Sequence, residues 1–161
     1  MEAGRRSIND IFNGNRILEI PFFQRSYVWK EEQWERFLED MESISETQMP
    51  YFMGSIILKQ QETQAEQSVG DKRTLVDGQQ RLTTLQLFIK VMCLRLKDNS
   101  RFDRVFRLDN DYSIALLHNH NDEEVFNKIV NLDVELDVQG KDGISAVYNY
   151  FKENIDLERL D

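Results

Sequence analysis

Two short stretches hold the side chains whose types and spacing suit chemistry. The first, residues 76–84, reads VDGQQRLTT and joins a short apolar run to a helical pattern. The first amides of a helix lack intrahelical partners, and that helix end carries about half a positive charge, so an anion fits there. Gly78 permits a close backbone approach, and Arg81 adds a full charge near the first turn. The stretch therefore predicts an anion site.

The same residues also fit a helix cap that needs no ligand. Asp77 would be the N-cap and Gln80 the third helical residue of a capping box, which leaves Gln79 and Arg81 unexplained. A cation at a helix N-terminus opposes the dipole at a cost of about 0.3–1 kcal/mol unless an anion lies nearby. That anion is either a native carboxylate or a ligand phosphate, and the spacing favours neither.

The second stretch, residues 20–29, reads IPFFQRSYVW and gathers four aromatic side chains around one arginine. Arg25 offers a planar fork of donors suited to phosphate or carboxylate. Tyr27 and Trp29 would flank a planar ligand such as a base. The alternative is an aromatic loop packed over the core, with Arg25 paired to an internal carboxylate.

Hydrophobic periodicity predicts the elements that must position these stretches. Strands are expected at 18–20, 51–59 and 74–76, and helices at 30–45, 79–97, 112–117, 122–132 and 144–155. Gly54, inside the second expected strand, is typical of a bulge or a close backbone approach. The polar residues 60–73 are expected to form a surface loop. This order predicts a mixed α+β fold.

Composition narrows the class of protein. The 161 residues, 40% of them apolar, suit a single domain, with a motif core at 7–97 and a helical extension at 98–161. No apolar run exceeds five residues, and no apolar segment follows the basic pair near the N-terminus, so neither a membrane span nor a secretory signal is predicted. The one cysteine, Cys93, is expected to pack in the core as a small apolar side chain. The lack of a predicted signal or span, together with this low cysteine content, favours a cytoplasmic location.

Charge and the remaining motifs limit the function further. The net charge is -9, so bare duplex DNA would be repelled on average. Neither a P-loop nor a Rossmann fingerprint is present, and no cluster of metal-ligating side chains is predicted. The string His118-Asn119-His120 is interpreted as a helix end followed by the N-cap of the next helix. The chain ends without a closing turn signal, so we expect it to be part of a longer protein.

The motifs of both stretches resemble those of one family. The run Ser7-Ile8 with Ile11-Phe12 is followed by IPFFQRSYVW, YFMGSIIL and LVDGQQRLTTLQLF, in that order, over about residues 7–95. This pattern resembles the N-terminal domain of GmrSD-like type IV restriction enzymes. The resemblance implies a ParB/sulfiredoxin-like fold, in which a glycine and arginine turn at a helix N-terminus binds a nucleotide or phosphate.

The resemblance also implies site residues and an activity. The turn corresponds to Asp77, Gly78, Gln79, Gln80 and Arg81, and Gln24 and Arg25 match the family's first motif. Members of the family bind and hydrolyse nucleoside triphosphates, and restrict modified phage DNA together with a C-terminal HNH nuclease domain. This chain has two histidines and no room for that domain, so it is not expected to cleave DNA alone.

Three functions are therefore carried forward. The first is a regulatory domain of a restriction protein that binds a nucleoside triphosphate with Mg²⁺, with hydrolysis of the triphosphate left open. In it Arg25 and Arg81 hold phosphates, the amides of 78–80 cradle one of them, and Asp77, the candidate catalytic residue, caps the helix or holds the metal through water. The others are a ParB-like DNA-binding or nicking domain, and a ligand-free interaction scaffold in which Arg25 pairs with Asp77. The domain is expected to act on DNA only through an HNH-type domain that this sequence lacks, or through a partner protein. The sequence leaves open whether the chain forms a homo-oligomer.

Overall fold

The computed structural model describes residues 7–21, 26–47, 54–60, 72–109, 111–119, 122–136, 138, 140 and 143–156. The helices are α1 (Ile8–Ile11), α2 (Glu31–Thr47), α3 (Gln79–Leu96), α4 (Ser100–Phe106), α5 (Glu123–Val130) and α6 (Gly143–Asn154). The strands are β1 (Ile17–Glu19), β2 (Ile57–Gln60), β3 (Lys72–Asp77) and β4 (Leu116–Leu117). The predicted mixed α+β class is confirmed. No helix among these residues is long and apolar enough to cross a bilayer.

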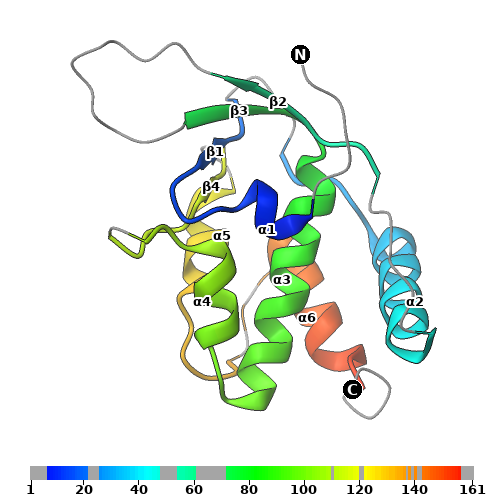
Figure 1. Cartoon of the computed structure of the whole chain (residues 1–161). Helices are drawn as coiled ribbons and strands as arrows, with labels where there is room; N and C mark the ends of the chain where they lie inside the picture. Colours follow the sequence, from blue (N-terminus) through cyan, green and yellow to red (C-terminus); the bar gives the residue numbers. More distant parts are fainter. Residues whose placement is uncertain are drawn as a thin grey trace.

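One small mixed sheet organises the described strands, in the order β2-β3-β1-β4 (Figure 1). Strand β1 pairs in parallel with β3 on one side and with β4 on the other, whereas β2 pairs antiparallel with β3. The carboxyl ends of β1, β3 and β4 therefore meet at the same edge of the sheet. In sheets of this kind that edge is the usual place for a ligand, because the chain turns from strands into helix N-termini there.

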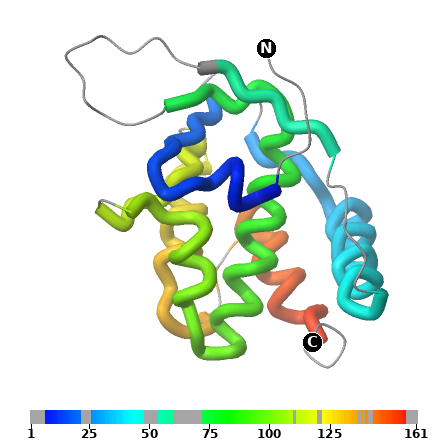
Figure 2. Tube along the Cα trace, viewed as in Figure 1, coloured from blue at the N-terminus to red at the C-terminus, as the bar shows by residue number. Residues whose placement is uncertain are grey.

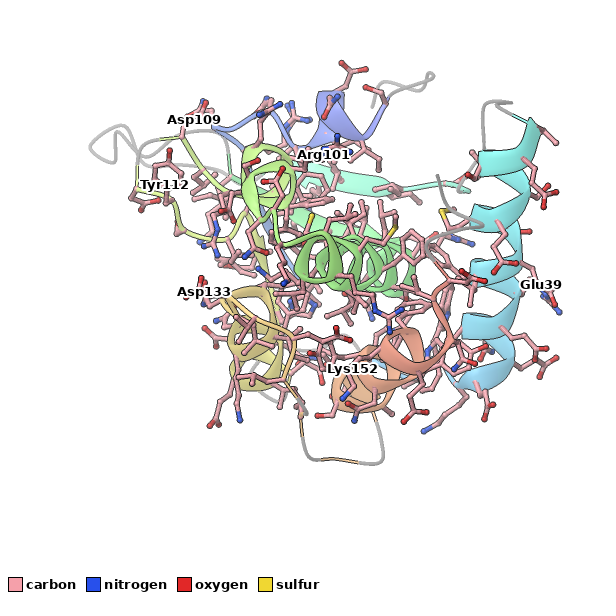
Figure 3. All side chains as sticks on the ribbon, turned by 90° about the horizontal axis from the view of Figure 1, so that it is seen from below. Glu39, Arg101, Asp109, Tyr112, Asp133 and Lys152 are labelled. Carbon is pink, nitrogen blue, oxygen red and sulfur yellow. The ribbon has the colours of Figure 1, made fainter. Side chains whose placement is uncertain are left out.

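Helix α3 forms the centre of the helical layer, with α2 on one side and α4 on the other (Figures 1 and 2). It contacts α4, α5 and α6. Phe88 of α3 meets the rings of Phe37 from α2 and Phe151 from α6 edge to face, each at 5.5 Å between ring centroids. Helix α2 is buried on the side that carries Trp34 and Phe37, and its Glu39 points away from the fold (Figure 3). These ring contacts hold the middle of α3 between α2 and α6.

The segment 112–117 is not a helix, contrary to the sequence-based prediction. Ile114 bridges to Arg107, and β4 pairs with β1. The backbone N–H groups of Leu18 and Ile20 donate to the carbonyls of Ala115 and Leu117, both at 2.8 Å. The free edge of β1 needs these backbone partners, and that requirement overrides the weak helical pattern of so short a segment.

Two further elements differ from expectation. The described part of the expected strand 51–59 is extended only from Ile57, so Gly54 lies before β2, and residues 51–53 lie outside the described ones. Helix α4 was not predicted, and it begins at a turn in which the Ser100 N–H donates to Asp98 Oδ1 at 3.0 Å. The helices predicted at 30–45, 79–97, 122–132 and 144–155 are confirmed with small shifts of their ends.

Candidate functional site

The turn between β3 and α3 is built on a glycine. Gly78 is the N-cap of α3 and adopts the left-handed region, with φ 103° and ψ 6°, and no side chain caps the helix. Asp77 lies one residue earlier, where its Oδ1 accepts a hydrogen bond from the Gly78 N–H at 2.9 Å. The prediction of Asp77 as N-cap in a capping box is therefore wrong. Gly78, in the left-handed conformation, is itself the N-cap, so the Asp77 carboxylate lies before the start of the helix.

Gln80, the other half of the expected capping box, does not reach back to the cap. Its Oε1 accepts hydrogen bonds from the backbone N–H groups of Val28 at 2.9 Å and Trp29 at 3.3 Å. The side chain thus joins the start of α3 to the segment that follows β1. Two motifs that lie some fifty residues apart in the sequence are in direct contact through this one amide.

A second glycine lies against the same turn. A Cβ on Gly54, whose φ is 104°, would come within 2.9 Å of the Arg81 guanidinium, and a Cβ on Gly78 would come within 2.9 Å of Ile56 Cγ1. Arg81 also donates from Nη1 to the Ser55 carbonyl at 3.2 Å. The close backbone approach predicted at Gly54 is confirmed, and it brings the segment before β2 over the N-terminus of α3.

Arg81 brings a cation to the first turn of α3 that no carboxylate of the described residues pairs with. Within the described residues no carboxylate lies in ion-pair distance of it; the Ser55 carbonyl is its hydrogen-bond partner there. Oδ1 of Asp77, the acidic residue nearest to Arg81 in the sequence, accepts a hydrogen bond from the Gly78 N–H instead. Among the described residues, an ion pair with one of the protein's own carboxylates therefore does not explain the position of Arg81.

The segment 26–30 is fastened to the helices by buried hydrogen bonds. The Tyr27 hydroxyl lies 2.6 Å from Thr84 Oγ1 and accepts from Trp34 Nε1 at 2.9 Å. Asp122 Oδ2 accepts from the Tyr27 N–H at 2.7 Å. Burial raises the pKa of Tyr27 far above its ordinary value, so the ring is a neutral part of the core. Gln24 and Arg25, which precede this segment, lie outside the described residues.

A small pocket opens where the parallel strands end. Its described lining residues are Ile20, Tyr27, Gln79, Gln80, Thr83, His118, Asn119 and Asp122. The space inside it is about 10 Å³, which is room for about one water molecule. Of the predicted site residues it contains Tyr27, Gln79 and Gln80, whereas Asp77, Gly78 and Arg81 lie outside its lining.

Sequence reasoning missed the part of the pocket that comes from β4 and α5. His118 follows β4 directly, so its interpretation as a helix end is wrong, because the Leu116–Leu117 segment pairs as a strand. Asn119 does form a turn before α5, where its Oδ1 accepts from the Asp122 N–H at 3.2 Å. The apolar pair Leu116–Leu117, followed at once by polar residues, is the signal that could have indicated a strand end here.

Burial perturbs both titratable groups that β4 and α5 contribute. Desolvation lowers the pKa of His118 to about 3, so the imidazole is neutral at ordinary pH. Its Nε2 lies 2.8 Å from Thr83 Oγ1, and its ring lies 3.9 Å from that of Phe126. Desolvation raises the pKa of Asp122, and the hydrogen bond from the Tyr27 N–H opposes this by a smaller amount. Perturbed carboxyl and imidazole groups in one pocket are typical of functional sites.

Described by its parts, the molecule is an α+β domain with a candidate anion-binding turn and a polar pocket at the carboxyl edge of its parallel strands. The chain belongs to the family described as GmrSD restriction endonuclease, N-terminal domain, whose model matches residues 8–160. The resemblance found in the sequence motifs is thereby confirmed, and it extends through the helical region. This membership supports a DNA-restriction context. No curated protein matches the sequence significantly.

Proposed function

We propose that this domain binds a nucleoside triphosphate, and hydrolyses it with Mg²⁺, as a regulatory part of a DNA-restriction protein. The observation that carries the proposal is Arg81, a cation in the first turn of α3 without a carboxylate partner among the described residues. A cation placed there opposes the helix dipole, and a bound polyanion removes the conflict by interacting with both.

The surrounding geometry supports a phosphate at this turn. Gly78 starts α3 without a side-chain cap, so the amides of the first helical turn are not covered by a capping side chain. The turn lies at the carboxyl edge of the parallel strands, and it shares Gln79 and Gln80 with the lining of the pocket beside it. The nucleotide's phosphate end would occupy this region, and Arg25 would add a second cation. The ParB/sulfiredoxin-like fold that the family resemblance implies is part of the same proposal.

Mg²⁺ fits the residues present only as a companion of the phosphates. In the described part of the chain, no three His, Cys, Asp or Glu side chains come together as a metal site. Magnesium bound with phosphates usually needs only one or two carboxylates. Asp77 is exposed at the turn and, with Oδ1 on the Gly78 amide, would hold the ion through its other oxygen or through water. The ion would supply neutralisation of phosphate charge.

The test is a titration of labelled ATP and of labelled GTP, each with Mg²⁺, into the wild-type chain and into Arg81→Ala. A charged hydrogen bond contributes about 1.5–3 kcal/mol, so the variant should bind roughly 10- to 100-fold more weakly. Arg36→Ala is the matched control, because Arg36 is 74% exposed on α2 and forms an ion pair with the equally exposed Glu32, at 4.0 Å.

The control should bind like the wild type. Equal affinities for wild type and Arg81→Ala would refute the phosphate role of this turn. Binding of duplex DNA that weakens steeply with salt, without any nucleotide binding, would favour the ParB-like DNA-binding alternative instead.

A further inference from the structure

The pocket at the strand ends holds polar groups that the phosphate turn does not use. Gln79 and Gln80 belong both to the turn and to the pocket, so a phosphate at the start of α3 would border this space. His118, which directly follows β4, and Asp122, the N-cap of α5, also line this pocket. The pocket therefore places a carboxylate and an imidazole beside the proposed phosphate position.

Asp122 has one oxygen engaged and one available. Oδ2 accepts from the Tyr27 N–H at 2.7 Å, which fixes the orientation of the carboxylate. Oδ1 makes no hydrogen bond with a described residue, and the side chain is half-buried at the pocket wall. A carboxylate that is oriented by one bond and keeps a second oxygen for another molecule is the arrangement of a general base.

His118 supplies a second unsatisfied polar atom. Its side chain is 8% exposed, its Nε2 lies 2.8 Å from Thr83 Oγ1, and its Nδ1 is buried without a well-formed hydrogen bond to a described residue, although the Leu116 backbone is close enough to raise the pKa of the ring slightly. Buried polar atoms are nearly always paired with protein or with ordered water. An unpaired ring nitrogen in a residue that lines the pocket thus points to a small polar molecule, such as water, at this position.

We propose that this pocket holds the attacking water for triphosphate hydrolysis and that Asp122 accepts its proton. The inference rests on the proposed nucleotide function. The water oxygen forms a bond to the terminal phosphorus, and the bond from that phosphorus to the bridging oxygen breaks, with its electron pair leaving on the nucleoside diphosphate. One water proton passes to Asp122 Oδ1 and then to solvent. The products are the diphosphate and inorganic phosphate.

Asp122 suits this role better than Asp77, the residue chosen from the sequence. Asp77 is exposed and lies outside the pocket lining, with one oxygen held by the Gly78 amide. Asp122 is partly desolvated, and burial raises its pKa towards the range in which a carboxylate becomes an effective base near neutral pH. In this proposal Asp77 helps to hold the metal ion, and Asp122 accepts the proton of the attacking water.

The test compares Asp122→Asn with the wild-type chain in two separate measurements. Binding is titrated with a non-hydrolysable ATP or GTP analogue and Mg²⁺, and turnover is followed by phosphate release from ATP and GTP. Asparagine keeps the oxygen that accepts from the Tyr27 N–H, so the fold and the docked segment should persist, which thermal unfolding checks. Glu124→Gln is the matched control, since Glu124 is an exposed residue of the same helix turn.

We expect Asp122→Asn to bind the analogue within about twofold of wild type and to lose turnover about 100-fold or more. The pH profile of the wild-type kcat should show an acid limb that the variant lacks. The titratable side chains that share the described pocket with Asp122 are Tyr27 and His118, both neutral in this range because of burial. Glu124→Gln should match the wild type in both measurements.

Four other results would overturn the inference. Wild-type turnover in Asp122→Asn would show that another group takes the proton. Loss of analogue binding in that variant would show that Asp122 acts by positioning the segment at Tyr27. A wild-type chain that binds the analogue but releases no phosphate would remove the reaction while leaving nucleotide binding in place. A wild-type chain that binds no nucleotide would refute the proposed function itself.

Discussion

Replacing Gly78 by alanine tests whether the turn at the start of α3 depends on close packing with the segment before β2. The residue has φ 103°, beyond the usual left-handed region of non-glycine residues. The new Cβ would lie 2.9 Å from Ile56 Cγ1 and 3.4 Å from Ile56 Cα. The substitution therefore combines backbone strain with a steric clash.

The two effects can be estimated separately. A left-handed conformation costs a residue with a Cβ about 1–2 kcal/mol. Forcing an extra carbon into a packed contact costs about 1–3 kcal/mol. Gly78→Ala should therefore lower the free energy of unfolding by about 2–5 kcal/mol. At roughly 2–4 °C per kcal/mol for a chain of this size, Tm should fall by about 4–20 °C.

Gly143→Ala is the matched control, because Gly143 has φ 69° but nothing within 4 Å of an added Cβ. It should cost only the strain, about 1–2 kcal/mol. Urea unfolding of both variants gives the difference. The double variant Gly78→Ala with Ile56→Ala should be less destabilised than the sum of its single changes, because Ile56→Ala removes the clashing atom. Equal costs for Gly78→Ala and Gly143→Ala, with additive effects in the double variant, would refute the close-packing argument.

Two further stability predictions concern buried polar groups. Tyr27→Phe should lower the free energy of urea unfolding by about 1–3 kcal/mol, since Trp34 Nε1 loses its acceptor in the core; an unchanged midpoint would contradict this. For His118, burial lowers the pKa from 6.5 to about 3 in the folded state, so the unfolded chain binds the extra proton between those values and stability falls as the pH falls. Between pH 6.5 and 5 the free energy of unfolding should fall by about 2 kcal/mol from this group. Unfolding of His118→Gln at the same two pH values should lack that contribution. Equal pH dependence in both proteins would contradict the proposed role of His118.

The helices that position the site could be predicted because their signal is local. Apolar residues recur at helical spacing in both segments, so the sequence of each indicates which face of the helix is buried. They are Trp34, Phe37, Leu38 and Met41 in the first segment, and Leu82, Leu85 and Ile89 in the second. The turn at Gly78 was predicted for the same reason, since a strand, a glycine and a helix start follow one another within a few residues. One of the family motifs, LVDGQQRLTTLQLF, covers this turn and the start of its helix, and was recognised with them.

Hydrophobic periodicity did not predict strand β4, because two residues carry no measurable periodicity. Leu116–Leu117 is a strand because β1 presents unpaired backbone groups to it. The pocket depends on that pairing, since His118 and Asp122 reach it only when β4 lies beside β1. The sequence left open whether Asp77 caps the helix for a similar reason, because only the backbone angles show that Gly78 occupies the cap.

The amino-acid sequence by itself determined the class of fold, the family, and the presence of a glycine and arginine turn at a helix start. Tertiary structure alone decided what surrounds Arg81, which residues bond to Gln80, and which carboxylate faces the pocket. The reason is physical. Helix periodicity and turn chemistry act between near neighbours in the chain, whereas ion pairing, burial and the resulting pKa shifts depend on groups that folding brings together from distant segments.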